Sequence, residues 1–179
     1  MSSETPDLRN RVEDSRGLLK KIQLVVPGFR GYRQLEDLRE ADELLRRQVV
    51  QVLQGTESLV KQARINMVNS GDYGNLQPAA SLLSKMQMLE GDIMHAEQGY
   101  SGFSPAIRVN QQTLDSLYEY DYAFIASASL LKSTADAAGV ASLSGDSLNS
   151  ELAKLSVMVD DIRSSLSKRM EAVENIKVA

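Results

Sequence analysis

The chain has 179 residues, of which 42% are hydrophobic, and it carries a formal net charge of -4 with no cysteine. This length and composition suit one domain with a continuous core, so a second independent domain is not expected. The negative charge disfavours nucleic-acid binding, which normally requires a basic surface to neutralise phosphates. Without cysteine the chain cannot form a disulfide, a thiolate metal site or a cysteine nucleophile, and it suits a reducing cytoplasm.

No segment reaches the roughly 18 consecutive apolar residues that a membrane-spanning helix requires. The most apolar stretch, residues 122–131, is interrupted by Ser127 and Ser129. The first twenty residues include four acids and no apolar segment, so they do not predict a secretory signal. We therefore expect a cytoplasmic protein without transmembrane helices.

Apolar residues recur at spacings of three and four along most of the chain, which predicts about five amphipathic α-helices. Pro27 and Gly28 should end the first helix, and the turn-forming residues 70–75 should end the second. Gly99 and Gly139 are placed to end the third and fourth helices. The expected helices of a single domain, 1–179, cover about residues 6–26, 32–69, 76–98, 111–138 and 147–177.

The fifth helix has the longest regular seam, with apolar residues at alternating spacings for about four heptads. The predicted seam is Leu148, Leu152, Leu155, Val159, Ile162, Leu166, Met170, Val173 and Ile176. Short connections favour antiparallel neighbours, with the turns after the first and third helices at one end. We therefore predict an all-α fold, an elongated up-and-down antiparallel helical bundle of about five helices with coiled-coil-like seams.

Two aspartates interrupt otherwise apolar seams, Asp42 in the second helix and Asp121 in the fourth. Each is either buried and paired with an arginine or tyrosine, or it lies at the edge of a seam whose register differs from the prediction. The other charged residues of this part of the chain are interpreted as a mixed-charge face exposed to solvent, and they are Arg33, Glu36, Asp37, Arg39, Glu40, Glu43, Arg46 and Arg47.

Aromatic residues gather at the end of the bundle that would hold the turns after the first and third helices. The candidates for a ligand site there are Phe29, Tyr32, Tyr100, Phe103 and Tyr118. The simpler interpretation is an aromatic plug that closes this end of the core.

The only histidine of the sequence lies near the same end, together with several carboxylates. Asp92 and His95 have the three-residue spacing that carboxylate-bridged di-metal bundles use. The candidate ligands for a divalent metal are His95, Asp92, Glu36, Glu40, Asp115 and Glu119. Such sites take the motif from two helices, and a histidine at a helix C-terminus is favoured by the helix dipole alone. The sequence therefore favours a protein without a cofactor.

No motif in the sequence forces a chemistry, since it has neither a serine nucleophile elbow nor a phosphate-binding glycine loop. Whether the protein is an enzyme stays open, and a non-enzymatic role is favoured. We expect a helical interaction or scaffold protein that binds partner helices or self-associates, with the seam of the fifth helix as the candidate pairing surface. The alternative is a small-ligand or metal-binding bundle with its site at the aromatic end.

A further hypothesis concerns peripheral membrane contact through the first helix. Residues 1–33 contain seven basic and four acidic residues, which would suit an anionic lipid surface. The favoured interpretation of this segment is an ordinary amphipathic core helix, because its apolar stripe is narrow and lacks tryptophan and phenylalanine.

Two stretches of the sequence resemble segments of an uncharacterised prokaryotic helical-bundle family. The first combines PGFRGY, residues 27–32, with READELLR, residues 39–46. The second combines GYSGF, residues 99–103, with LYEYD, residues 117–121. The resemblance supports the predicted turns and helix starts. Because the family has no established activity, it implies no catalytic residue.

Overall fold

The computed structural model describes residues 8–31, 35–96 and 111–178. Over these residues the chain is helical and contains no strand, so the predicted all-α fold is confirmed. The elements are α1 (Leu8–Val25), α2 (Leu35–Ser70), α3 (Leu76–His95), α4 (Gln111–Ala138), the short 3-10 helix η2 (Val140–Ser142) and α5 (Gly145–Val178).

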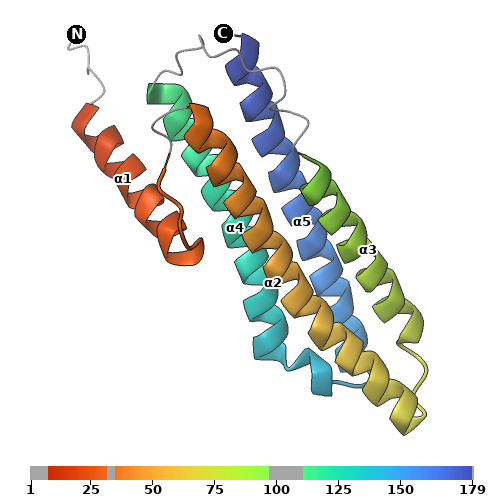
Figure 1. Cartoon of the computed structure of the whole chain (residues 1–179). Helices are drawn as coiled ribbons and strands as arrows, with labels where there is room; N and C mark the ends of the chain where they lie inside the picture. Colours follow the sequence, from red (N-terminus) through yellow and green to blue (C-terminus); the bar gives the residue numbers. More distant parts are fainter. Residues whose placement is uncertain (1–7, 32–34, 97–110, 179) are drawn as a thin grey trace, which may run out of the picture.

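Four long helices pack as a ring, in which α2 and α5 each contact both α3 and α4. Figure 1 shows α2 and α4 running in one direction and α3 and α5 in the other. The consecutive pairs α2–α3 and α4–α5 are therefore antiparallel neighbours, as short connections predict. The ring is a bundle with one continuous core along its axis.

The first helix lies outside this ring, against α4 (Figure 1). It runs in the same direction as α2, because the chain turns back along α1 after Val25 instead of entering the next helix directly. The predicted antiparallel order is therefore wrong for this first pair, and the turn after α1 lies part-way along the bundle. Burial explains this path: Val26, Phe29 and Gly31 of the connection are all buried.

The apolar spacings of three and four match the buried positions closely in α3 and α4. In α4 the buried seam residues are Leu117, Asp121, Phe124, Ala128, Leu131 and Ala135. In α3 the residues Leu82, Met86, Leu89 and Ile93, which recur at spacings of three and four, are buried, whereas Met88 is 63% exposed.

The second half of α2 follows a slightly different register. Leu53 and Val60 are buried there, while Val52 and Leu59, which would also continue the spacings of three and four from Val49, only pack against the edge of the core. Both registers keep the spacings of three and four, so the sequence pattern alone does not distinguish them.

The seam of α5 is buried inside the bundle. Leu148, Leu152, Leu155, Val159, Ile162 and Leu166 are each at most 4% exposed. The seam that the sequence offered as a pairing surface is therefore used within the chain, where α5 packs on α3 and α4.

The turn between α2 and α3 is bonded to the start of α5 at the far end of the bundle. α2 ends in a Schellman motif, in which Gly71 and Asp72 donate to the carbonyls of Val68 and Met67. Asn75 then donates from Nδ2 to the Gly145 carbonyl at 2.7 Å. These contacts fix where α5 enters the bundle.

We expect Asn75→Ala to lower the free energy of unfolding by about 1–2 kcal/mol, because it removes a hydrogen bond made by a buried side chain. Asn66 offers a matched control, since its exposed Nδ2 donates to the Ala141 carbonyl at the same distance, 2.7 Å. Asn66→Ala should cost under about 0.5 kcal/mol, because water can replace an exposed donor. Urea unfolding followed by circular dichroism measures both variants, and equal losses would contradict the role of burial.

Candidate functional site

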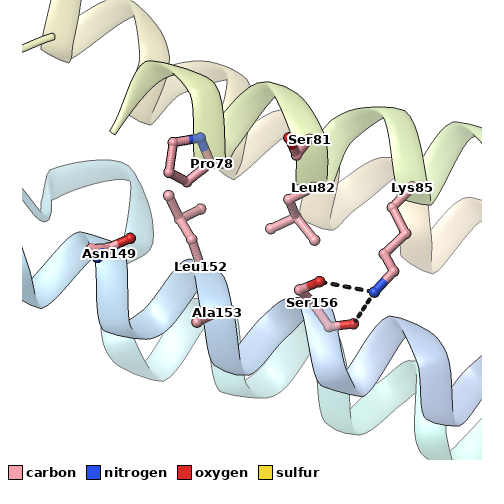
Figure 2. Close-up of a pocket in the computed structure, with 8 residues that line it drawn as sticks. All are labelled: Pro78, Ser81, Leu82, Lys85, Asn149, Leu152, Ala153 and Ser156. Carbon is pink, nitrogen blue, oxygen red and sulfur yellow. Dashed lines mark hydrogen bonds between the residues drawn. The ribbon is translucent and has the colours of Figure 1, made fainter. Parts of the chain in front are cut away.

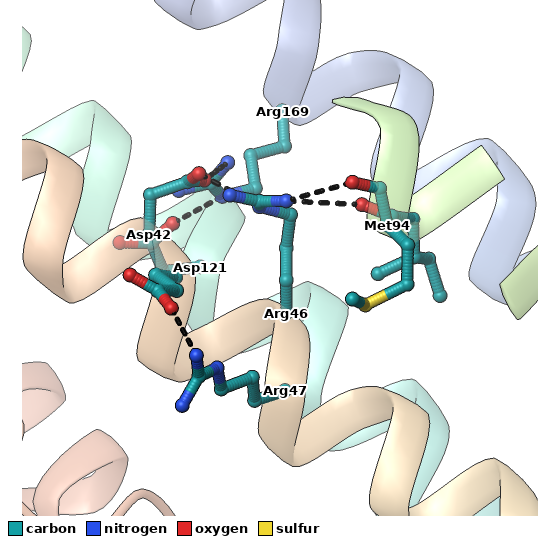
Figure 3. A network of polar contacts seen from close by, with 8 residues as sticks. Asp42, Arg46, Arg47, Met94, Asp121 and Arg169 are labelled. Carbon is teal, nitrogen blue, oxygen red and sulfur yellow. Dashed lines mark hydrogen bonds and ion pairs between the residues drawn. The ribbon is translucent and has the colours of Figure 1, made fainter. Parts of the chain in front are cut away.

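An ion network lies inside the bundle near the end where α2 and α4 begin (Figure 3). It consists of Asp42 and Arg46 of α2, Asp121 of α4 and Arg169 of α5, each at most 4% exposed. Arg169 donates from Nη1 to Asp42 at 2.5 Å and from Nε to Asp121 at 2.6 Å. Arg46 donates from Nε to the other oxygen of Asp42 at 2.7 Å. Two arginines and two aspartates thus join three helices with balanced charge.

The side chain of Arg46 connects α3, the remaining helix of the ring, to this network. Its Nη1 lies 3.4 Å from the carbonyl oxygen of Ile93 and 3.3 Å from that of Met94. Both carbonyls belong to the last turn of α3, where the helix dipole places partial negative charge. The network therefore contacts every helix of the ring.

Sequence reasoning found half of the network. Of the two alternatives left open for Asp42 and Asp121, the structure shows the first, in which both are buried and paired with an arginine. The assignment of Arg46 to a solvent-exposed face is wrong, because Arg46 lies four residues after Asp42 and shares its core-facing side of α2. Its neighbour Arg47 does lie on the exposed face, where it pairs with Glu43.

The buried Arg169 was missed because Met170 was placed on the seam of α5. A strict alternation of four and three from Leu148 through Leu166 reaches position 169, not 170. In the structure Arg169 is 2% exposed, and Met170 lies at the edge of the core. The heptad spacing alone predicts a core position at Arg169. Methionine is the more common core residue, which favoured Met170 instead.

The chemistry of this network suits positioning of helices. The guanidinium groups supply only hydrogen-bond donors, and the carboxylates are occupied as acceptors. Buried ion networks add little net stability relative to an apolar core, yet removing one partner is costly. The network therefore penalises arrangements in which the helices of the ring are shifted along one another.

Two of the aromatic candidates contact each other beside the network. Phe29, after α1, and Tyr118 of α4 are both buried, with ring centroids 6.5 Å apart at an interplanar angle of 73°. This edge-to-face contact anchors the connection after α1 on α4. The other three candidates, Tyr32, Tyr100 and Phe103, lie outside the described residues.

The candidate metal ligands do not converge in the part of the chain that the structure describes. Asp92 is ion-paired with Arg163 of α5 at 2.9 Å, and His95 is exposed at the end of α3. Glu40 and Glu119 are exposed, Asp115 is half-buried, and the side chain of Glu36 lies outside the described residues. Within the described residues no group of three histidine or carboxylate side chains could hold a metal ion. The metal site stays a prediction.

The C-terminal half of α2 exposes a short apolar surface, here named the α2 strip. Ile65 and Val68 lie one helical turn apart, and each is 53% exposed. With Lys61, Arg64 and Asn69 they line a shallow depression of about 380 Å³. The strip therefore combines apolar side chains with basic borders on an outer helix face.

A second depression, of about 400 Å³, lies between α3 and α5 (Figure 2). Pro78 and Leu152 line its apolar part, and Lys85 lies at one side. The ammonium group of Lys85 donates to the carbonyl and hydroxyl oxygens of Ser156 and pairs with Asp160 at 2.6 Å. Its charge is thus already engaged by α5, so Lys85 serves to join the two helices.

The first helix uses its apolar side to pack on α4. Ile22 is buried, Lys20 and Lys21 are exposed, and the Lys21 ammonium lies 5.3 Å from the ring centroid of Tyr122. Leu24 is 87% exposed on this helix. Among the described residues, no helix combines the length and apolar character that crossing a bilayer requires. Peripheral membrane contact through α1 stays a prediction.

The two stretches that carry the family resemblance meet in space at this end of the bundle. Phe29 and Asp42 belong to the first stretch, and Tyr118 and Asp121 belong to the second. Phe29 and Tyr118 form the aromatic contact, while Asp42 and Asp121 both accept from Arg169.

No protein-family model matches the chain, and no curated protein or solved structure matches it.

Proposed function

We propose that the protein is a non-enzymatic interaction protein that binds an amphipathic helix of a partner along the α2 strip. The observation that carries this proposal is the pair Ile65 and Val68, which stand half-exposed on one outer face of a long helix. A spacing of three residues on a helix surface matches the way an amphipathic helix places its anchors in a groove. The α5 seam is buried within the chain, which supports placing the pairing surface on α2 instead.

Charge favours a partner helix with acidic side chains. Lys61 and Arg64 border the strip, and Lys61 is already paired with Glu57 of its own helix. Two copies of the strip placed face to face would bring basic side chains together, which opposes self-association through this surface. A helix that carries leucines on one face and glutamates beside them fits both the apolar and the basic residues.

The ion network supports this role indirectly. It contacts all four helices of the ring and begins on α2 at Asp42. A helix held in this way presents its outer face without a large rearrangement on binding, which lowers the entropic cost of association.

The test is a titration of the methyl-labelled full-length protein with a synthetic helical peptide that has leucines at positions i, i+3, i+4 and i+7 and flanking glutamates. We expect chemical-shift changes at Ile65 and Val68. The double variant Ile65→Ser, Val68→Ser should bind about five- to thirtyfold more weakly, because it removes apolar area worth about 1–2 kcal/mol.

Val157→Ser is the matched control, because Val157 is 60% exposed on α5, away from the strip. It should bind the peptide as the wild type does. Equal binding of a scrambled peptide, or shifts confined to other surfaces, would contradict the proposal. A concentration-dependent dimer in native mass spectrometry that the double variant abolishes would replace the partner helix with a second copy of the chain.

A further inference from the structure

Two glutamates on neighbouring helices face each other without a donor between them. Glu57 of α2 is 4% exposed, and Glu90 of α3 is half-buried and contacts α2 at Gln54, three residues before Glu57 on the same side of that helix. Glu57 Oε2 accepts from Lys61 at 2.5 Å, and Glu90 Oε2 accepts from Gln54 at 3.4 Å. The Oε1 atom of each is shielded from solvent, and none of the described groups donates to it.

Two ionised carboxylates in this position would be unfavourable for two reasons. A buried acceptor without a donor loses its hydration without replacement, and two negative charges repel strongly where water is excluded. A single proton removes both costs, because the protonated carboxyl group becomes a donor to the other carboxylate. Carboxylate pairs that share a site behave in this way in other proteins.

We propose that Glu57 and Glu90 form a proton-binding site that joins α2 to α3 through a carboxyl–carboxylate hydrogen bond. The donor-less Oε1 atoms, one from each helix, are the two ends of this bond. Its ligand is one proton, and its loss leaves two like charges across the contact between α2 and α3.

Other charged groups near the pair leave this arrangement in place. On α2, the half-exposed Lys61 pairs with the Oε2 atom of Glu57. On α3, Lys85 and Asp92 are paired with Asp160 and Arg163 of α5. On α4, the Lys132 side chain approaches Gly55 of α2 but its ammonium pairs with Asp136. Among the described residues, Lys61 is thus the cation that acts on the two glutamates, and it partly offsets their negative charge.

Burial raises the pKa of Glu90, and the hydrogen bond and the charge of Glu57 raise it further, against smaller opposing effects of Gln54 and Lys61. In the unfolded chain the carboxyl group has its ordinary pKa, so the folded state binds the proton more tightly. The proton-linked stabilisation is therefore fully present below the ordinary glutamate pKa and is lost as pH rises through the raised pKa.

The direct test follows the side-chain carboxyl carbons of selectively labelled glutamate in the full-length protein through a pH titration by NMR. We expect the Glu90 signal to titrate above the ordinary range, with the Glu57 signal moving in the same step because the pair shares the proton. Glu57→Gln should bring the Glu90 midpoint down toward the ordinary value, since it removes the neighbouring charge. Glu171→Gln, at an exposed position of α5, should leave it unchanged.

An ordinary Glu90 midpoint in the wild type, or a raised one that Glu57→Gln does not lower, would overturn the proposal. A midpoint that falls when excess Ca²⁺ is added would also overturn it, because a cation would then occupy the place of the proton. A second measurement avoids dependence on the Glu57 variant. In urea unfolding, wild type should gain stability relative to Glu90→Gln as pH is lowered through the raised midpoint, because the amide supplies its donor at every pH.

Discussion

Replacing Arg169 with methionine is expected to lower the free energy of unfolding by about 3–5 kcal/mol, because the change leaves Asp42 and Asp121 buried without the cation that they share. Methionine is similar in length and unbranched, so the loss reflects charge more than a cavity. Urea unfolding followed by circular dichroism measures the effect. The variant should also unfold at lower temperature.

Arg163→Met provides the matched control for this prediction. Arg163 pairs with Asp92, but the two side chains are 38% and 54% exposed, so the loss should be under about 1 kcal/mol. Replacing Asp42, Arg46, Asp121 and Arg169 together with leucine or methionine should recover most of the stability that Arg169→Met loses, because no unpaired charge then remains in the core. If Arg169→Met and Arg163→Met lower the free energy of unfolding equally, burial does not determine the contribution of these ion pairs.

Gly31→Ala is expected to release the connection after α1 from α4. Gly31 has a φ of +83°, and a Cβ there would lie 2.8 Å from the Tyr118 hydroxyl oxygen and 3.2 Å from the Leu19 side chain. The left-handed backbone costs an alanine about 1–2 kcal/mol, and the overlap adds about 1–3 kcal/mol unless Tyr118 moves.

Gly28→Ala separates these two contributions. Gly28 has a similar φ of +85°, but a Cβ there would meet only the Leu44 side chain at an ordinary 3.8 Å. Trypsin cleavage after Lys20 and Lys21 reports opening of α1, which packs on the ring mainly through α4. We expect Gly31→Ala to be cleaved about five- to 150-fold faster than Gly28→Ala, which corresponds to the overlap of about 1–3 kcal/mol. Equal rates would show that the overlap with Tyr118 is relieved without cost.

The amino-acid sequence by itself determined the helices and most of their buried faces. Spacings of three and four place apolar side chains on one side of a helix whatever it packs against, so the seams of α3, α4 and α5 follow from local periodicity. The helix ends follow from equally local chemistry, as at Gly71, whose positive φ closes the Schellman motif after α2. Asp42 and Asp121 stood out for the same reason, because they break an apolar pattern.

Only the tertiary structure decided which polar side chains meet. The sequence pattern placed Arg46 on a surface face and did not single out Arg169, since a charged side chain normally indicates exposure. The burial of these arginines depends on partners up to 127 residues away in the chain. The Glu57–Glu90 contact likewise depends on the rotation of α2 against α3, which differs between two registers that share the same periodicity. The direction of α1 was decided by burial of Phe29 against Tyr118, a contact between segments that no local pattern connects.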